Sequence, residues 1–282
     1  MEFVKLAGPF GVFFVMFSLG LNLTIEKFTK VFKNPNNLIV GLFCQIIILP
    51  VIGLIVTFLV PLESEFRFGI FLLLIMPSAA MSNYASRLAN GDVSLSICLT
   101  SICALFSFIT IPFYLKIFTI FINENLLSTD INLFLFSIKT FTWITLPVFL
   151  GIFCRNKFNI IFEKLTFTFD RAALILFISI VLIAIYTEKD NLIGYFNDVG
   201  VIMSLILFLI FVSSFIITQI YVDDISSRRA IRIEALLQNG AMGFVIGALI
   251  FSEIMYLVPI AIYALLQYCF LLFYLGNIQI KN

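Results

Sequence analysis

The chain alternates long apolar segments with short polar connections. Nine apolar segments lie at about 7–23, 37–60, 66–89, 93–121, 131–153, 172–186, 199–221, 230–251 and 254–275. Most are close to the roughly 20 residues that a helix needs to cross a bilayer. They are uniformly apolar, without the alternation that a membrane β-strand shows. The pattern therefore predicts an all-α polytopic membrane protein with about nine transmembrane helices.

Two of these segments carry residues that interrupt helices. The segment at 66–89 contains Pro77, followed by short polar residues, and the segment at 230–251 contains Asn239-Gly240. Proline removes a backbone donor, and Asn-Gly favours a turn. Backbone groups freed inside a membrane are tolerated only within protein or beside water. Paired broken helices in two halves of a chain point to inverted repeats around a transport site at the membrane midplane.

Glu234 lies in the second interrupted segment. A carboxylate at this depth costs about 2.5–3.5 kcal/mol on insertion scales, which makes a functional role the first interpretation. Gln238 is four residues further on, so we expect both side chains on one helical face, just before the Asn239-Gly240 break. A structural ion pair with Arg232 or Lys139 is the alternative, although Arg232 is only two residues away and points elsewhere on a helix.

Uncharged side chains with an oxygen atom that could bind a cation also lie in the apolar segments. They are Gln45, Ser82, Asn83, Ser96, Thr100, Gln238 and Asn239. A single Ser or Thr is more simply explained by a close helix contact or by a bond to the preceding helical turn, and Gln45 or Asn239 alone could form an interhelical hydrogen bond. Together with a carboxylate they are typical of a sodium site, because sodium needs several oxygens and favours one negative charge.

Composition excludes several other classes of protein. Hydrophobic residues make up 62% of the 282 residues, charged residues make up 12%, and the mean hydropathy is +1.14, which excludes a soluble domain. The chain has no histidine, and its five cysteines show no CxxC spacing. The sequence shows no Ser/Lys pair at a plausible membrane depth and no paired membrane aspartates, so nothing in it indicates an intramembrane enzyme. We expect no enzyme activity, no transition metal and no cofactor.

The loop charges predict the orientation of the chain. One side receives Lys27, Lys30, Lys33, Arg155, Lys157, Lys164, Arg171, Arg228, Arg229 and Lys281, and the other receives Lys5, Arg67, Lys116 and Lys189. Because cytoplasmic loops are enriched in Lys and Arg, we expect the N-terminus outside and the C-terminus in the cytoplasm. The first apolar segment is interpreted as a span, without a leader cleavage pattern. A multi-pass protein of a bacterial inner membrane is expected.

Several motifs occur in order along nearly the whole chain. They are Met-Phe-Ser-Leu-Gly-Leu at 16–21, Gly-Leu-Phe-Cys-Gln at 41–45 followed by Pro50, Pro77 through Ser82-Asn83, Asn-Gly-Asp-Val-Ser-Leu-Ser at 90–96 with Thr100, and Glu234 through Gln238-Asn239. Together they resemble the bile acid:sodium symporter family. The resemblance implies a single transmembrane transporter domain over 1–282, in a nine-span form. Two discontinuous helices would cross in a core panel (about 37–121 and 199–277), beside a gate panel (about 7–24, 131–153 and 172–186).

The resemblance also implies site residues. One sodium site would use Ser82, Asn83, Ser96, Thr100 and Glu234, and a second would use Gln45, Gln238 and backbone carbonyls near Glu234, Ala235 and Leu237. Substrate would lie beside the crossing, near Asn239, Ala80, Met81 and Gln267. The departures fall on the substrate side: Pro77-Ser78-Ala79-Ala80 replaces the common Pro-Gly-Gly-Thr, and Gln267-Tyr268 replaces a His-Asn pair.

These features predict a sodium-coupled symporter that imports an organic anion by alternating access. The expected substrate is bile acid-like, sulfonated or a carboxylate, and the expected partners are Na⁺, that anion and the lipid bilayer, without nucleic acid. Two alternatives stay open. A proton-coupled transporter would use Glu234 as the carrier, and a non-transporting membrane receptor would bind substrate without turnover.

Overall fold

The fold is built almost entirely of helices. The computed structural model describes residues 2–24, 35–122, 133–158, 192–251 and 253–280, with single residues and short runs between 26 and 31 and between 161 and 179. Its elements are α1 Glu2–Asn22, α3 Pro35–Phe43, η1 Cys44–Ile48, α4 Leu49–Leu59, α5 Ser64–Leu74, α6 Met81–Leu88, α7 Val93–Ile122, α8 Leu133–Thr140, η3 Phe141–Thr145, α9 Leu146–Lys157, α11 Leu192–Tyr221, α12 Ile225–Leu236, α13 Gly240–Ile250, η4 Ile254–Tyr256 and α14 Val258–Ile280. Within the described ranges the β-structure is a single isolated bridge between Ser78 and Gln238.

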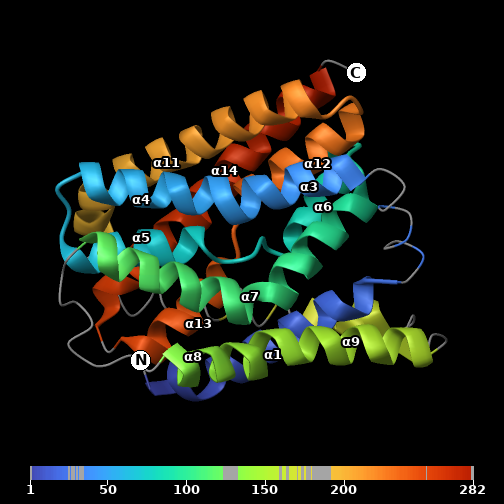
Figure 1. Cartoon of the computed structure of the whole chain (residues 1–282), viewed down its shortest axis with the longest axis horizontal. Helices are drawn as coiled ribbons and strands as arrows, with labels where there is room; N and C mark the ends of the chain where they lie inside the picture. Colours follow the sequence, from blue (N-terminus) through green and yellow to red (C-terminus); the bar gives the residue numbers. More distant parts are fainter. Residues whose placement is uncertain are drawn as a thin grey trace.

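The axes of most helices lie roughly alongside one another, and the helices form three groups (Figure 1). Helices α1, α8 and α9 lie together on one side, α3, α4, α11, α12 and α14 lie on the opposite side, and α5, α6, α7 and α13 lie between them. The largest apolar cluster joins residues of all three groups, including Met16, Phe71 and Ile206. The middle group is therefore enclosed on both sides.

The predicted polytopic helical fold is confirmed. Among the residues that the structure describes, five helices are long and apolar enough to cross a membrane: Pro35–Leu59, Val93–Phe121, Phe134–Lys157, Gly194–Tyr221 and Val258–Asn277. A shorter apolar helix spans Pro9–Asn22. The segment expected at 172–186 lies almost entirely outside the described residues, so the count of nine spans and the division into core and gate panels remain predictions.

Both expected helix interruptions are present. Helix α5 ends at Leu74 and α6 begins at Met81, while α12 ends at Leu236 and α13 begins at Gly240. The expectation that Gln238 shares a helical face with Glu234 is wrong, because α12 ends before Gln238 and this residue has extended, non-helical backbone. The helix expected from 254 begins at Val258 instead, after a short 3₁₀ turn, with Pro259 in its first turn, where a missing backbone donor is harmless.

Capping residues fix the ends of the helices that surround the interruptions. The Asp92 carboxylate accepts from the backbone N–H groups of Ser94 and Leu95 at the start of α7. Asp224 caps α12 in the same way through Ser227 N–H at 2.8 Å. Hydrogen bonds from Ser226 and Ser227 hold the pKa of the Asp224 carboxyl below its ordinary value, so this cap stays ionised at neutral pH.

A π-helical turn carries Gln45 toward the interior. This turn, η1, interrupts the helix that continues from α3 to α4, and Pro50 follows it. Pro50 has no N–H to donate to the Ile46 carbonyl one turn earlier, and the Tyr114 hydroxyl donates to that carbonyl instead. The local widening of the helix leaves the Gln45 side chain buried against the interruption in the neighbouring helix.

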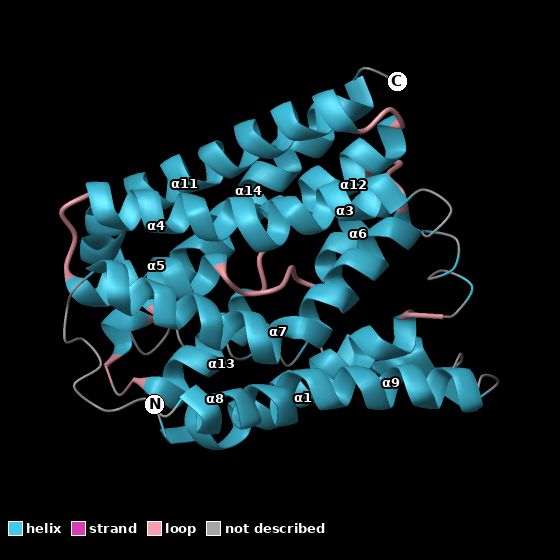
Figure 2. Cartoon of the chain, in the orientation of Figure 1, coloured by secondary structure: helices cyan, strands magenta, loops and turns pink. Residues whose placement is uncertain are grey.

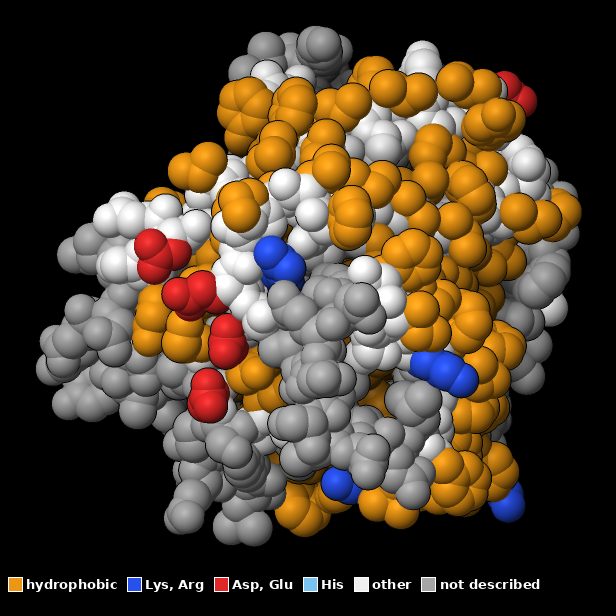
Figure 3. All heavy atoms as spheres, turned by 60° about the vertical axis from the view of Figure 1, so that its left-hand side comes forward, with side chains coloured by type: hydrophobic (Ala, Val, Ile, Leu, Met, Phe, Trp, Pro, Cys, Tyr) orange, Lys and Arg blue, Asp and Glu red, His pale blue; other side chains and the backbone are white. Residues whose placement is uncertain are grey.

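Much of the outer surface is apolar (Figure 3). Large side chains such as Phe58, Val201 and Leu272 are each about 70% exposed or more, as expected of side chains that face lipid. Acidic side chains gather at one edge of the face in Figure 3. Exposed or partly exposed acids occur between α4 and the start of α5 (Glu63 and Glu65), in the first turns of α11 (Asp198) and between α13 and η4 (Glu253).

Helices α1 and α9 approach each other through two glycines. A Cβ atom at Gly20 would lie 2.3 Å from the Val148 carbonyl oxygen, and one at Gly151 would lie 2.3 Å from the Phe17 carbonyl oxygen. Both obstacles are backbone atoms, which cannot rotate away. Small residues at such a crossing let two membrane helices pack closely.

Gly151→Ala is therefore expected to separate α1 from α9 and to destabilise the protein by about 1–3 kcal/mol. Gly276→Ala in α14 is the matched control, because a Cβ there meets nothing within 4 Å and the helix gains propensity from the change. Thermal unfolding of the two purified variants in detergent measures the difference. Equal melting temperatures for both would contradict the close crossing.

Candidate functional site

The two interrupted helices meet at the centre of the molecule. Their connecting segments run side by side between α5, α6, α12 and α13 (Figure 2). Ala79 N–H donates to the Leu237 carbonyl at 2.8 Å, and Asn239 N–H donates to the Pro77 carbonyl at 3.0 Å. Each interruption therefore provides hydrogen-bond partners for some of the backbone groups that the other leaves without helical partners. Two helices end at this crossing and two begin there, so partial charges of both signs converge on it.

Glu234 lies beside the crossing and is only 3% exposed. Its Oε1 accepts from Ser82 Oγ at 2.5 Å and from Ser96 Oγ, and its Oε2 accepts from Thr100 Oγ1 at 2.8 Å and from Ser78 Oγ. The four hydroxyl groups come from the first interruption, from α6 and from α7. Glu234 thus hydrogen-bonds to three segments of the chain that are all more than 130 residues away from it in sequence.

No cation balances the Glu234 carboxylate among the described residues. Arg232 donates to Thr218 Oγ1 at 2.7 Å and to Gln219 Oε1 at 3.2 Å, away from the crossing. Lys139 is exposed on α8. The structural ion pair that either residue would form with Glu234 is therefore absent from the described part of the chain.

The hydroxyl cluster has more acceptors than hydrogens. Ser96 Oγ lies within reach of both Glu234 and Asn83 Oδ1, the latter at 2.9 Å. Thr100 Oγ1 lies within reach of both Glu234 and the Ser96 carbonyl, the latter at 3.0 Å. Because each hydroxyl has one hydrogen to donate, neither can serve both acceptors at once. The cluster is therefore rich in oxygen lone pairs, which is chemically suited to a hard cation.

A second polar cluster surrounds Gln45 and Gln238. Gln45 Nε2 donates to Gln238 Oε1 at 2.9 Å and to the Met76 carbonyl at 3.1 Å. Gln238 Nε2 donates to the Ala235 carbonyl at 2.9 Å. Gln45 Oε1 is buried and has no hydrogen-bond partner in the described part of the chain. An acceptor oxygen left unpaired in the interior costs about 1–3 kcal/mol unless something binds it.

Asn239 follows Gln238 in the second interruption and precedes α13. Its Oδ1 accepts from Met242 N–H at 3.0 Å and so caps α13. Its Nδ2 is buried and donates to no partner among the described residues. Ala80 and Met81 are partly exposed at the start of α6.

Gln267 supports the interruption from α14. Its Oε1 accepts from Gln238 N–H at 2.9 Å, and the side chain is 1% exposed. Tyr263, one turn earlier, donates its hydroxyl to the Leu236 carbonyl at 3.0 Å, where α12 ends. Gln267 therefore holds backbone in place, while its expected contact with substrate stays a prediction.

Ser78 was missing from the ligands expected from the sequence. The sequence places it among the substrate-side residues after Pro77, whereas in the structure its hydroxyl donates to Glu234 Oε2 and lies 3.1 Å from Thr100 Oγ1. A hydroxyl residue directly after the proline of a predicted interruption was the available signal. Its direction toward Glu234 depends on how the two interruptions pair, which one helical pattern does not specify.

Comparison with known proteins gives a consistent result. Residues 9–195 match the family described as the Sodium Bile acid symporter family, and this match ends before Glu234. The chain is 24% identical over 252 residues to a probable sodium/metabolite cotransporter, BASS2, of rice chloroplasts (Oryza sativa subsp. japonica), covering 89% of this chain and 59% of that protein. It is also 24% identical over 250 residues to an uncharacterized sodium-dependent transporter, YocS, of Bacillus subtilis, covering 89% and 76%. The human ileal sodium/bile acid cotransporter is 32% identical over 108 residues, which is 37% of this chain and 30% of that protein.

Gln267→Met should destabilise the fold, because it leaves the buried N–H of Gln238 without an acceptor. The expected loss is about 1–3 kcal/mol. Thr110→Val is the control, since its exposed hydroxyl bonds only the Phe106 carbonyl of its own helix. The measurement is thermal unfolding in detergent. If both variants unfold like the wild type, the Gln267 bond does not hold the interruption.

Proposed function

Because the chain belongs to the Sodium Bile acid symporter family, a family of transporters and not of enzymes, we propose that it is a sodium-coupled symporter of an organic anion. The observation that carries the proposal is the buried Glu234 carboxylate, which has four hydroxyl groups around it and no cationic partner among the described residues. A sodium ion supplies the missing positive charge.

The first sodium ion would bind between the two oxygens of Glu234 and the hydroxyl cluster. Its ligands would be Ser82, Asn83, Ser96 and Thr100, with Ser78 added because its hydroxyl reaches the same carboxylate. A bound cation accepts the lone pairs for which the cluster has too few hydrogens. The chemistry of hydroxyl, amide and carboxylate oxygens fits sodium, which needs no nitrogen or sulfur ligand.

The second sodium ion would bind at Gln45 and Gln238. The unpaired Oε1 of Gln45 supports this assignment, because it is a buried acceptor without a donor. The Ala235 and Leu237 carbonyls each accept one hydrogen bond, and each keeps a second lone pair for a cation. Two ion sites would thus lie next to the paired interruptions, one at Glu234 and one at Gln45 and Gln238.

The organic anion would bind at Asn239 and the start of α6. The unpaired, buried Nδ2 of Asn239 offers a hydrogen bond to a carboxylate or sulfonate oxygen. Helices α6 and α13 begin at the crossing, so their backbone donors and positive ends favour negative charge there. Ala80 and Met81, which are partly exposed, would contact the same solute.

Coupling would arise because sodium binding fixes the crossing before the solute binds. Two sodium ions that move through 100 mV release about 4.6 kcal/mol, before any concentration gradient is counted. At about 1.4 kcal/mol for each factor of ten, this energy alone would sustain a gradient of more than roughly a thousandfold. Moving one negative charge inward against the same potential costs about 2.3 kcal/mol and lowers that gradient to roughly fortyfold. Alternating access would then expose the crossing to each side in turn.

The proposed orientation has the N-terminus outside and the C-terminus in the cytoplasm of a bacterial inner membrane. Its support is the basic end of the molecule, where α9 ends with Arg155 and Lys157 and α12 begins with Arg228 and Arg229. Both ends lie at the same side in Figure 1. Positive loops favour the cytoplasmic side of a membrane.

Sodium should stabilise the purified protein more than potassium does at equal ionic strength, and Glu234→Gln should remove the difference. A ligand at a hundred times its dissociation constant adds about 2.7 kcal/mol, which a thermal unfolding assay detects. Glu253→Gln is the control, because this exposed carboxylate lies far from the crossing in sequence and is not part of the cluster. If sodium does not change the unfolding temperature, and pH changes it in the wild type but not in the Glu234→Gln variant, proton coupling through Glu234 is supported instead.

Asn239→Leu should weaken binding of organic anions more than it weakens binding of sodium. Removing the amide deletes the proposed donor and also the cap of α13, whereas Asn239→Asp keeps the cap oxygen and repels an anion. Sodium-dependent uptake into vesicles and sodium-induced stabilisation are measured in parallel for both variants. A loss of sodium affinity with unchanged solute affinity would show that the two sites have been exchanged.

A further inference from the structure

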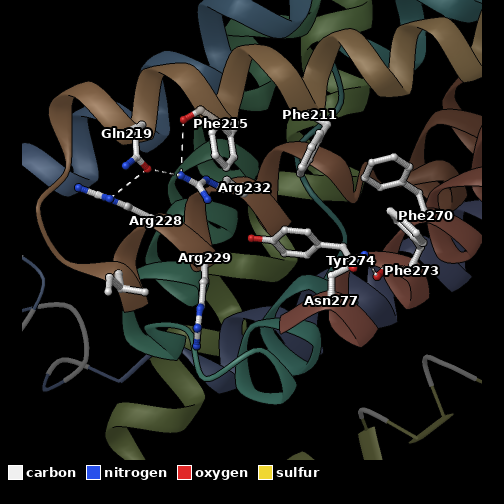
Figure 4. Close-up of a pocket in the computed structure, with 11 residues that line it drawn as sticks. Phe211, Phe215, Gln219, Arg228, Arg229, Arg232, Phe270, Phe273, Tyr274 and Asn277 are labelled. Atoms are coloured by element: carbon white, nitrogen blue, oxygen red, sulfur yellow. Dashed lines mark hydrogen bonds between the residues drawn. The ribbon is translucent and has the colours of Figure 1, made fainter. Parts of the chain in front are cut away.

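A separate cavity lies away from the crossing, between α11, α12 and α14 (Figure 4). Its volume is about 410 Å³. Arginines of α12 and Gln219 of α11 form one part of its wall, and aromatic side chains of α11 and α14 form the rest. It lies where α11 ends at Tyr221 and α12 begins at Ile225, which is one end of the helical bundle.

Two guanidinium groups share one neutral acceptor in this cavity. Arg228 Nη1 donates to Gln219 Oε1 at 3.0 Å, and Arg232 Nη2 donates to the same oxygen at 3.2 Å. The dashed lines of Figure 4 show both bonds converging on Gln219. Further bonds of the pair go to Thr218 Oγ1 and to the carbonyls of Val222 and Phe215, and Arg232 also interacts with the Tyr274 hydroxyl.

The positive charge of these arginines is not neutralised by the described part of the chain. Every hydrogen bond of Arg228 and Arg232 ends on an uncharged oxygen, and Arg229 likewise donates to the Ala89 carbonyl. Arg232 is only 8% exposed, with its guanidinium 4.1 Å from the centre of the Phe215 ring. Buried cations are normally paired, so this cluster lacks an anion.

The cavity changes from polar to apolar along its length. On α11, Gln219 lies near the helix end, and Phe215 and Phe211 follow one and two turns further into the bundle. On α14, the exposed Asn277 is followed in the same direction by Phe273 and Phe270. Because Phe273 is 68% exposed on the apolar outer surface, the aromatic part of the cavity is open to the side of the molecule.

We propose that this cavity binds an anionic phospholipid. The phosphodiester oxygens would take bidentate hydrogen bonds from Arg228 and Arg232, which offer the planar donor geometry that phosphate prefers. The Tyr274 hydroxyl, which points toward the arginines in Figure 4, adds a further donor. An acyl chain would follow the rings of Phe211 and Phe270 toward the middle of the bilayer.

The charge and the position of the cavity favour a lipid over a soluble anion. Basic pockets between membrane helices recognise lipid headgroups at the depth where a membrane meets water, and the arginines lie at a helix end. An inorganic phosphate would use the arginines alone and leave the aromatic wall uncovered. The proposal concerns a site separate from the helix crossing and does not depend on sodium coupling.

The test compares lipid binding to the purified full-length protein by native mass spectrometry and by thermal shift in detergent. Phosphatidylglycerol is the anionic probe, phosphatidylcholine the zwitterionic one, and glycerol phosphate the headgroup without chains. We expect phosphatidylglycerol to bind at least about tenfold more tightly than either of the others. Arg228→Gln should weaken phosphatidylglycerol binding about fivefold, the effect expected of one arginine near a lipid phosphate.

Arg87→Gln is the matched control. Arg87 is an exposed arginine at the last turn of α6, so its removal changes the net charge equally without touching the cavity. Phe270→Ala should weaken binding of phosphatidylglycerol and leave glycerol phosphate unaffected. Equal binding of the two lipids would overturn the proposal, as would equal effects of the Arg87 and Arg228 variants. Glycerol phosphate binding as tightly as the lipid would also overturn it and assign the arginines to a soluble anion.

Discussion

The structure depends on the pairing of two interrupted helices at its centre. Neither interruption could stay in an apolar interior alone, because each leaves backbone donors and acceptors without helical partners. The bonds from Ala79 to Leu237 and from Asn239 to Pro77 solve this problem for both at once. The pairing also brings Ser78 and Glu234 together, so the bonds that stabilise the backbone create the polar cluster.

The positions of the interruptions could be predicted from the sequence, and the way they pair could not. Pro77 and Asn239-Gly240 are local signals, so they marked the breaks correctly. Helical spacing predicted that Ser96 and Thr100 share a face, and the resemblance to a known family implied that both meet Glu234, as they do in the structure. The side-chain direction of Gln238 depends on where α12 ends and on Gln45 in a distant π-helical turn, and no local pattern contains that information.

The basic end of the molecule shows the same difference between local and tertiary information. Arg228 and Arg229 were loop charges in the sequence and predicted only an orientation. Their position beside Arg232 and the aromatic wall of α14 arises from the packing of three helices, which brings together side chains about 50 residues apart. The acidic residues at the opposite end give the molecule an electrostatic polarity along its helices.

The two amides beside the crossing are each held at one end. The nitrogen of Gln45 donates to Met76 and Gln238, so only its oxygen remains available to bind a ligand. Asn239 has its oxygen committed to Met242, so only a nitrogen remains. A flip of either amide would sacrifice the bonds already made. An amide side chain can normally both donate and accept, but here each keeps only one of these functions. Gln45 therefore favours a cation or a donor, Asn239 favours an anion or an acceptor, and this selectivity needs no charged side chain.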